Sequence, residues 1–372
     1  MKKKILITST DVMMLQFLAP HVFYLQNQGY EVEVACSNVE NHVDELKDIF
    51  KTKVKMHLVK LKRNPMQISN VRGLLQLMKI IKAGSYDIVW TNEPVMGIMT
   101  RLAARIVRRK KVKIIYVAHG FHFYKDAPKK NWIIYYPIEK CLAKWTDKLV
   151  TITNEDYQLA SEKFPCSVYH VHGVGVKTQK YDSVTIEQAH EIRRKNGWDK
   201  SFLILCTGEL NANKNQITLI KAMPDILREN PNVKLLLAGN GPYEENIKSV
   251  IRELGLEGQV KLLGYRTDLE WFVKMSDLCV SASIREGLPV NVLEAMYCGK
   301  PVVVSDNRGH RELIENGKNG YIVEARDVKA FTNRVLELIR NSEEREKFGE
   351  TSKKRVQLYT DIHVKEELKL IY

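Results

Sequence analysis

Short runs of β-branched and apolar residues alternate with longer amphipathic segments along the first half of the chain. Between these runs, apolar residues recur at i, i+3, i+4 and i+7, as in ISNVRGLLQLMKIIKAG, and this period indicates helices. Strands that alternate with helices are typical of βαβ units in a parallel sheet. The predicted strands of this half are KILIT, EVEVACS, KVKMHLV, DIVWTN, KIIYVAHG, KLVTITN and VYHVHGV.

The same alternation returns after a polar stretch. Residues 174–200 lack a strand pattern, which indicates a linker and a lead-in helix. We therefore expect two doubly wound, Rossmann-like α/β domains around a cleft, one from residues 1–178 and one from 179–356. Residues 357–372 have no strand after them and are expected to pack back on the first domain. The second set of predicted strands is FLILCTGE, VKLLLAGNG, VKLLG, LCVSAS, PVVVSD and GYIV.

Composition is that of a globular protein with reduced thiols. The chain has 372 residues, 44% of them hydrophobic and 27% charged, which suffices for two ordinary domains. Its six cysteines form no C-x-x-C pair and no metal-ligand spacing, so disulfides and a zinc site are not expected. The apolar run of the N-terminus MKKKILITSTD is too short for a signal peptide, and no stretch approaches a membrane span. We expect a cytoplasmic protein.

The net charge of +14 is confined to the first half of the chain. Residues 1–180 hold 29 basic and 15 acidic residues, whereas residues 181–372 hold 29 of each. This asymmetry indicates that the first domain alone meets an anionic surface or partner.

Two glutamates eight residues apart are candidates for chemistry. The stretch SIREGLPVNVLEAMYCGKPVVVSD places Glu286 in a turn after a strand and Glu294 in the apolar helix that follows. Pro289 is well placed to begin that helix. A half-buried carboxylate needs hydrogen-bond donors, and vicinal hydroxyls of a sugar supply two of them. An ion pair of Glu294 with a lysine or arginine of the same domain is the alternative that the residues alone leave open.

The pattern E-G-L-P-V-N-V-L-E-A-M followed by C-G-K-P-V-V resembles the E-x7-E signature of family 4 glycosyltransferases, which are retaining enzymes of the GT-B fold. GELNANKNQITLIKAM at 208–223 is similar to the family's strand–loop–lysine segment, and LLLAGNGP at 235–242 to its nucleotide-side loop. DNRGHRELIENGKNGYIV at 306–323 is similar to the segment after the active helix. The resemblance is ordered across residues 200–325 and looser over the first half.

The resemblance implies roles for individual residues of the second domain. Glu294 would hold both ribose hydroxyls of a nucleotide sugar, Glu286 would contact the transferred sugar, and Lys214 would neutralise the diphosphate leaving group. Backbone amides at the start of the helix would hold that sugar and the distal phosphate. The remaining donor-side residues are Gly287, Leu288, Pro289 and Val290 at this helix, Gly208, Gly239 and Asn240 in the phosphate and nucleotide loops, and Tyr265 and Arg266 as candidates for the base pocket. For Tyr265 and Arg266, ordinary loop surface is an equal alternative.

One position departs from the family pattern. Many relatives carry arginine five positions before the lysine, where this chain has Glu209. A carboxylate beside phosphates would repel them, so we expect Glu209 to turn away and pair with a neighbour. The sequence also lacks a D-x-D motif, so Lys214 and a helix N-terminus are expected to hold the diphosphate without an obligatory metal or other cofactor.

The acceptor side is expected in the first domain. His119 and Gly120 end a strand and resemble the family's His-Gly segment, whose histidine lies near the transferred sugar. A structural histidine is the alternative, and His122 is a second candidate. The N-terminal Gly-Gly loop of the family is missing, and ITSTDVMM stands in its place.

Aromatic and basic residues interleave after this strand. Such a mixture suits the interface of an anionic membrane, with a solvated helix face and core aromatics as the alternatives. Nothing in the chain resembles a nucleic-acid-binding motif. The candidate membrane or acceptor contacts are Lys125, Lys129, Lys130 and Trp132. The aromatics are Phe121, Phe123, Tyr124, Trp132, Tyr135 and Tyr136, and a separate basic run comprises Arg101, Arg105, Arg108, Arg109, Lys110, Lys111 and Lys113.

The resemblance implies a retaining hexosyl- or N-acetylhexosaminyltransferase of capsule, exopolysaccharide or related glycan synthesis. It would use a nucleotide diphosphate sugar, with UDP expected first, and a polyprenyl-diphosphate-linked acceptor at the inner face of the cytoplasmic membrane. A nucleotide-sugar epimerase of the same fold and a non-catalytic nucleotide-sugar-binding protein are the alternatives. A nicotinamide dehydrogenase is disfavoured, because no G-x-G-x-x-G opens the first helix.

Overall fold

The structure is a computed structural model. It describes residues 2–10, 12–38, 43–51, 53–64, 67–107, 112–125 and 127–372. The chain divides into two compact units. Unit 1 comprises Met1–Val174 and Lys365–Tyr372, and unit 2 comprises Gly175–Val364.

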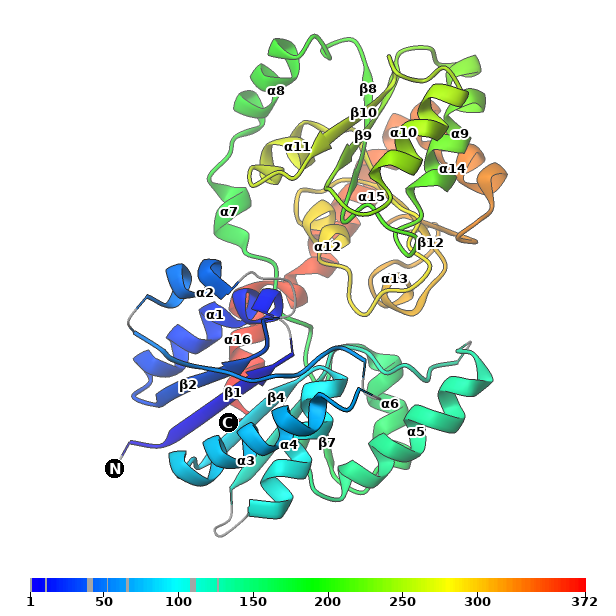
Figure 1. The fold of residues 1–372 in the computed structure, drawn as a ribbon. Helices are drawn as coiled ribbons and strands as arrows, with labels where there is room; N and C mark the ends of the chain where they lie inside the picture. The colour runs from blue at the N-terminus through cyan, green and yellow to red at the C-terminus, as the bar shows by residue number, and fades with distance from the viewer. Residues whose placement is uncertain are drawn as a thin grey trace. The chain divides into compact units, whose positions relative to one another are not determined.

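Unit 1 is built on a seven-stranded parallel sheet (Figure 1). Its order is β3-β2-β1-β4-β5-β6-β7, so the direction of winding reverses between β1 and β4. Ligands of doubly wound sheets bind beside the carboxyl ends of the strands at such a reversal. The strands are β1 Lys4–Ser9, β2 Glu31–Cys36, β3 Lys55–Leu58, β4 Ile88–Asn92, β5 Lys113–Ala118, β6 Lys148–Thr151 and β7 Ser167–His170.

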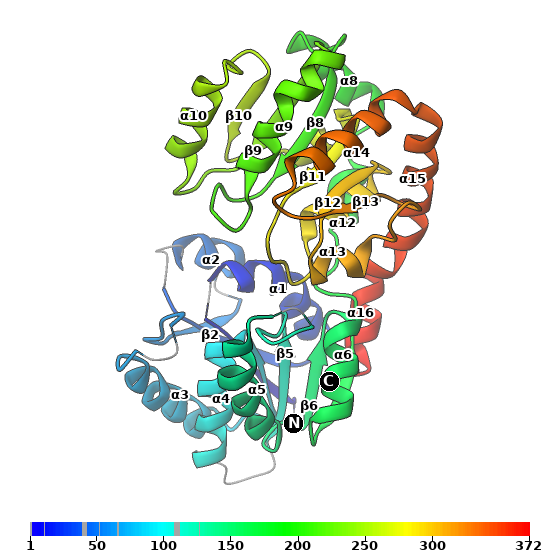
Figure 2. The same ribbon diagram turned by 90° about the vertical axis from the view of Figure 1, so that its right-hand side faces the viewer.

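Helices follow the strands of unit 1 one by one. They are α1 Val12–Asn27, α2 Val43–Phe50, α3 Asn70–Gly84, α4 Pro94–Val107, α5 Lys129–Ala143 and α6 Asn154–Lys163. Helix α3 packs on α4 and α4 packs on α5, and the three lie side by side in Figures 1 and 2. The central strands carry apolar residues on both faces, since Ile5, Leu6 and Ile7 of β1 are all fully buried.

Unit 2 repeats the plan with a six-stranded parallel sheet of order β10-β9-β8-β11-β12-β13. The winding reverses between β8 and β11. The strands are β8 Phe202–Thr207, β9 Val233–Ala238, β10 Val260–Gly264, β11 Leu278–Ser281, β12 Val302–Ser305 and β13 Tyr321–Val323. All thirteen strands expected from the hydrophobic pattern are therefore confirmed.

The helices of unit 2 include two in the polar stretch before β8. These are α7 Thr178–Asp182 and α8 Ile186–Lys195, the latter opened by a capping box of Thr185 and Gln188. The others are α9 Gln216–Glu229, α10 Glu244–Glu253, α11 Leu269–Met275, α12 Val290–Tyr297, α13 Arg308–Leu313, α14 Val328–Arg340 and α15 Ser342–Arg355. A 3-10 helix, Val356–Tyr359, leads to α16, Asp361–Lys369.

The last residues of the chain belong to unit 1. The Lys113 ammonium donates to the carbonyl of Ile371 (3.0 Å), and the ring of Tyr372 lies 5.5 Å from that of Trp90. Both contacts hold the C-terminal residues on the sheet of unit 1.

Candidate functional site

The turn between β11 and α12 carries Glu286, and α12 carries Glu294. Pro289 immediately precedes α12, and its carbonyl accepts from the amides of Val292 and Leu293 (both 3.2 Å). The amides before them have no partner within the helix, as at any helix N-terminus. Val292, Leu293 and Met296 of α12 are buried in the core, whereas Glu294 is only half-buried on another side of the helix. The amphipathic pattern thus separates the carboxylate from the core residues beside it.

Lys214 and Glu286 meet at this end of the sheet. The Lys214 ammonium lies 2.6 Å from Oε1 of Glu286, and both side chains are largely buried. Their loops are joined as well, because the amide of Ile284 donates to the carbonyl of Asn213 (2.7 Å) and the Asn213 side chain donates to the carbonyl of Arg285 (3.0 Å). A cation, a carboxylate and a helix N-terminus therefore converge at the β8–β11 reversal.

Gly208 and Gly239 bring two backbone loops close together. Both have positive φ, of 143° and 145°. A Cβ on Gly239 would lie 2.1 Å from the carbonyl oxygen of Gly208, so a side chain cannot fit there. Gly208 lies beside Lys214, whose Cε would be 3.3 Å from a Cβ at that position. The carbonyl of Asn240 accepts from the amide of Leu210 (2.9 Å) and ties the second loop to the first.

Glu294 faces the linker helix α7. Burial raises the pKa of its carboxyl group, and the neighbouring Tyr181 hydroxyl and Lys180 ammonium oppose that rise. The phenol of Tyr297, one turn away, contacts both carboxylate oxygens of Asp182 (2.8 and 3.0 Å). Polar side chains of α7 thus lie beside the carboxylate of Glu294 and beside Tyr297 of the same helix.

Two further loop residues, Glu209 and Arg266, have side-chain partners within unit 2. Oε2 of Glu209 accepts from the side chain of Asn211 (2.8 Å), so its carboxylate is bound within its own loop. Arg266 is held by Asp268, with Nε 2.8 Å from Oδ1, and its guanidinium lies 4.9 Å from the centre of the Phe272 ring. Tyr265 is exposed.

A buried polar network under Glu286 was missed by the sequence reasoning. The carbonyl of Ser283 accepts from the Ser305 hydroxyl (2.5 Å) and from the Asn307 side chain (2.8 Å). Asn307 also caps α13 by accepting from the amide of His310 (3.0 Å), and His310 Nδ1 lies 2.6 Å from the carbonyl of Ser305. Burial lowers the pKa of His310 to about 4, so its ring is neutral. The signal available in the sequence was the Asn307 N-cap directly after a strand.

His119 lies at the carboxyl end of β5 in unit 1. Its Nε2 is 3.1 Å from Oδ1 of Asn92, whose Nδ2 donates to the carbonyl of Thr8 (3.1 Å). Because the Asn92 amide donates from its nitrogen to Thr8, its oxygen faces the histidine, and Nε2 of His119 is the donor. Burial lowers the pKa of His119 to about 4. The result is a neutral imidazole with an oriented tautomer.

Glu93, which the sequence did not single out, contacts the loop that follows β1. Its Oε2 accepts from the hydroxyl of Ser9 (2.5 Å) and from the amide of Thr10 (2.7 Å). Its φ of 63° is left-handed, which is uncommon for a residue other than glycine. The loop that replaces the family's Gly-Gly segment therefore binds a carboxylate from β4–α4.

The aromatic residues after β5 are divided between the core of unit 1 and half-buried positions. Phe121 and Phe123 are buried, and Phe123 packs on Trp132 (5.6 Å between centroids). Trp132 Nε1 donates to the carbonyl of Tyr124 (3.1 Å), whereas Lys125, Lys129 and Lys130 are exposed. The remaining aromatics that pack against this cluster are Tyr135 and Tyr136.

The separate basic run between Arg101 and Lys113 does not form one continuous surface. Arg101 is buried, with its guanidinium 2.8 Å from Glu139 and 3.9 Å from the ring centre of Tyr116. The side chain of Lys113 bonds Ile371. Residues 108–111 lie outside the described part of the chain.

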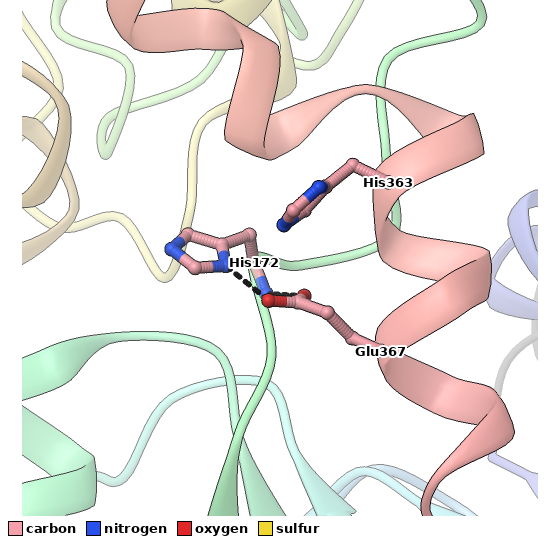
Figure 3. A group of neighbouring side chains, drawn as sticks. All are labelled: His172, His363 and Glu367. Atoms are coloured by element: carbon pink, nitrogen blue, oxygen red, sulfur yellow. Dashed lines mark hydrogen bonds and ion pairs between the residues drawn. The ribbon is translucent and has the colours of Figure 1, made fainter.

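Three side chains near the C-terminus could hold a metal ion (Figure 3). His363 and Glu367 are one turn apart on α16, and one ligand atom from each, with one from His172, lie within 4.8 Å of one another. The two carboxylate oxygens of Glu367 accept from the backbone amide (2.9 Å) and contact Nδ1 (2.6 Å) of His172. The two contacts of Glu367 with His172 thus fasten the end of α16 to the segment after β7.

Comparison with known proteins places both halves of the chain in glycosyltransferase families. Residues 188–355 match the family described as glycosyl transferases group 1, and residues 5–154 match glycosyl transferase 4-like. The putative glycosyltransferase EpsD of Bacillus subtilis is 36% identical over 378 aligned positions, which cover 100% of this chain and 97% of EpsD. A UDP-Gal:alpha-D-GlcNAc-diphosphoundecaprenol alpha-1,3-galactosyltransferase of Escherichia coli is 27% identical over 318 residues. The alignment covers 84% of this chain and 81% of the relative.

Solved structures share the fold across the whole chain. Alr3699/HepE of Anabaena in complex with UDP-glucose superposes with a TM-score of 0.79 at 17% identity and covers 99% of this chain and 98% of its own. A glycosyltransferase from Rickettsia africae gives a TM-score of 0.78 at 18% identity, covering 100% of this chain and 98% of its own.

Proposed function

Since the chain belongs to the group 1, family 4 glycosyltransferases, we propose that it is a retaining enzyme that transfers a sugar from a UDP-sugar to a polyprenyl-diphosphate-linked glycan. The expected fold class, two Rossmann-like α/β units as in GT-B glycosyltransferases, is confirmed. The contact between Lys214 and Glu286 carries the proposal, because it joins the two side chains assigned to the leaving group and to the transferred sugar.

In the proposed donor complex, the diphosphate lies at the N-terminus of α12. The amides of Gly287, Leu288 and Val290 bind the distal phosphate and the sugar, and the helix dipole favours the negative charge. Lys214 then exchanges part of its contact with Glu286 for a phosphate oxygen. Glu286 is freed to accept from hydroxyls of the transferred sugar, and Glu294 accepts from both ribose hydroxyls.

The proposed chemistry is displacement of the nucleoside diphosphate by an acceptor hydroxyl from the face that the leaving group vacates. The bond from the anomeric carbon to phosphate oxygen breaks as the bond to the acceptor oxygen forms, and a phosphate oxygen takes the acceptor's proton. The protein supplies position and electrostatics. Lys214 and the α12 N-terminus stabilise the charge on the departing diphosphate.

Unit 1 is proposed to serve the acceptor and to contribute His119 to the reacting sugar. Neutral imidazole with Nε2 bound to Asn92 leaves Nδ1 as an acceptor for a sugar hydroxyl. A lipid-linked acceptor is supported by the name of the E. coli relative, which acts on a diphosphoundecaprenol-linked sugar. Synthesis of capsule, exopolysaccharide or a related surface glycan would use such acceptors.

The proposed location is the inner face of the cytoplasmic membrane, with unit 1 against the lipid. Among the described residues, every helix is too short or too polar to cross a bilayer. The excess positive charge of residues 1–180 supports attraction to anionic lipid.

Incubation of the full chain with a panel of nucleotide sugars and a polyprenyl-diphosphate-linked acceptor tests the proposal. We expect a lipid-linked product one sugar longer, with UDP-sugars as donors. Conversion of a UDP-sugar into an isomer without acceptor would identify an epimerase. Binding of donor without turnover across the whole acceptor panel would identify a nucleotide-sugar sensor.

A further inference from the structure

Helix α5 has two apolar faces. The inner face packs into the core through residues such as Tyr136 and Leu142. The opposite face exposes Ile133, Ile134 and Ile138, with 74%, 51% and 39% of their surfaces accessible. Exposed Pro137 and Cys141 continue the same stripe, since residues four apart lie on one face of a helix. The outward face of a surface helix is ordinarily polar, so this stripe requires a partner.

A second outward apolar face lies on α3 and the turn before it. Ile68 is 88% accessible, Val71 56% and Leu75 53%. A groove of about 280 Å³ opens beside them, lined by Ile68, Val71 and Leu74 from this side and by Met99 and Leu102 of α4. Since α3, α4 and α5 pack side by side in unit 1, the two faces belong to one layer of helices (Figures 1 and 2).

Basic residues border both apolar faces. On and before α5 these are the exposed Lys125, Lys129, Lys130, Lys140 and Lys144, and on α3 they are Arg72, Lys79 and Lys82. The acidic residue of α5, Glu139, is buried and bound by Arg101 (2.8 Å) and by the phenol of Tyr116 (3.2 Å). The outward side of α5 thus combines aliphatic residues at its centre with positive charge at its rim.

We propose that the outward faces of α3 and α5 insert into an anionic bilayer, with Ile133 and Ile134 among the acyl chains and the flanking lysines at the phosphates. The proposal rests on the proposed lipid-linked acceptor and identifies the surface that brings unit 1 to it. Aliphatic residues enter the boundary of headgroups and acyl chains while lysine stems extend to the water side. A second copy of the chain is a poorer partner, because a two-fold interface would set the same lysines against each other.

Binding to vesicles of phosphatidylcholine and phosphatidylglycerol tests the insertion. Ile133→Ser with Ile134→Ser leaves the charge unchanged, and we expect it to lower the partition coefficient by about tenfold or more at both low and high salt. Lys129→Ser with Lys130→Ser should lower it mainly at low salt, where charges are unscreened. The matched control is Ile186→Ser with Leu254→Ser, two exposed residues of unit 2, and it should bind as the wild type does.

Unchanged vesicle binding by the isoleucine variant would overturn the proposal. So would a wild-type dimer, seen by sedimentation velocity, that the isoleucine variant abolishes while vesicle binding persists. The variant should transfer sugar to a short soluble acceptor at the wild-type rate, and equal losses on soluble and lipid-linked acceptors would also contradict insertion. If the proposed function is wrong instead, the wild type will transfer no sugar to the lipid-linked acceptor but will still bind vesicles. The two failures therefore give different results.

Cys141 supplies a reporter on the same stripe. It is exposed, whereas the other five cysteines are buried or half-buried, and burial raises the thiol pKa of Cys166 to about 11 and of Cys298 to about 12. A maleimide carrying an environment-sensitive fluorophore should therefore react at Cys141. Its emission should shift to the blue on the vesicles, and the isoleucine variant should reduce the shift. Emission that stays at its aqueous wavelength on bound protein would contradict insertion of this face.

Discussion

The ammonium of Lys214 lies 2.6 Å from Oε1 of Glu286, although the two residues are 72 positions apart in the chain. Their loops follow β8 and β11, the two strands between which the sheet of unit 2 reverses direction. Hydrogen bonds between the backbone and side chains of these loops fix their approach. The pairing keeps a cation and a carboxylate ready at the N-terminus of α12, where a diphosphate and its sugar would each engage one of them.

Lys214→Ala should reduce kcat more than donor affinity, because the charge on the leaving group grows in the transition state. One electrostatic stabiliser is worth roughly 10²–10³ in rate, or about 2.7–4 kcal/mol. Steady-state kinetics with a saturating donor measures the effect. Lys221→Ala, on the exposed side of α9, is the control and should keep the wild-type kcat. Near-normal turnover by the Lys214 variant would move the leaving-group role to Arg285 or Arg266.

Glu294→Ala should weaken UDP binding by about 1–3 kcal/mol, because charge-assisted hydrogen bonds to the ribose are lost. Isothermal calorimetry measures the change. A 2′,3′-dideoxyribose analogue of UDP is the matched control, since its affinity should hardly respond to the substitution. Equal affinity of the wild type and the variant for UDP would refute the ribose assignment.

The affinity for UDP should also fall as the solution becomes acidic. Burial raises the pKa of the Glu294 carboxyl, so this group takes up a proton at a higher pH than an ordinary glutamate. Its protonated form accepts hydrogen bonds less strongly, and binding is lost as the pH falls through the raised pKa. Calorimetry across mildly acidic pH should show this loss in the wild type, and Glu294→Gln should bind more weakly but with the acid-dependent step removed.

Asn92→Asp should introduce a titration into the pH profile of kcat/KM. In the wild type, burial keeps the pKa of His119 at about 4, so the ring stays neutral across neutral pH. A carboxylate 3.1 Å from Nε2 would favour the charged imidazolium and raise that pKa toward neutrality. Activity that depends on Nδ1 as an acceptor should then be lost as the pH falls. Identical profiles for the variant and the wild type would leave His119 a structural role only.

Unit 1 should lose stability in acid through Glu33. Lys4 (2.8 Å), His57 (2.6 Å) and Tyr86 (2.5 Å) surround this buried carboxylate. Burial opposes ionisation, but these partners outweigh it and lower the pKa of Glu33 to about 2, below the ordinary 4.5. A carboxylate whose pKa is lower in the folded state stabilises the fold at any pH above its unfolded pKa. Glu33 therefore contributes roughly 3 kcal/mol to the free energy of unfolding, and this is lost as the pH falls from about 4.5 toward 2. Thermal unfolding of the wild type and Glu33→Gln over this range should show a smaller pH dependence in the variant.

The strands could be predicted from the sequence, because they depend on the period of the hydrophobic pattern. The joint role of Glu286 and Lys214 at one donor site was implied by the family resemblance. The orientation of α5 could not be predicted. Its apolar residues surround the helix, so the pattern left open which face enters the core, and the aromatic side enters it while the isoleucines face outward. Burial of a side chain is decided by packing in the folded unit.

The hydrogen-bond partners of the site residues could not be predicted from the sequence either. Asn92 and Thr8 orient His119, and Ser305 with Asn307 holds the carbonyl of Ser283 three positions before Glu286. Each of these contacts joins segments that lie on separate strands, and no local propensity encodes them. Glu93 has a left-handed φ that a glutamate adopts only under the constraint of its surroundings.

The anomeric configuration of the newly formed bond decides whether the enzyme transfers sugar with retention. A UDP-sugar whose anomeric carbon is α-linked to the diphosphate would be transferred to the polyprenyl-diphosphate-linked acceptor, and the product would be released and analysed by proton NMR. We expect an α-glycoside, identified by the small coupling constant of its anomeric proton. A β-linked product would contradict retention, and an isomerised UDP-sugar with no transferred sugar would contradict glycosyl transfer itself.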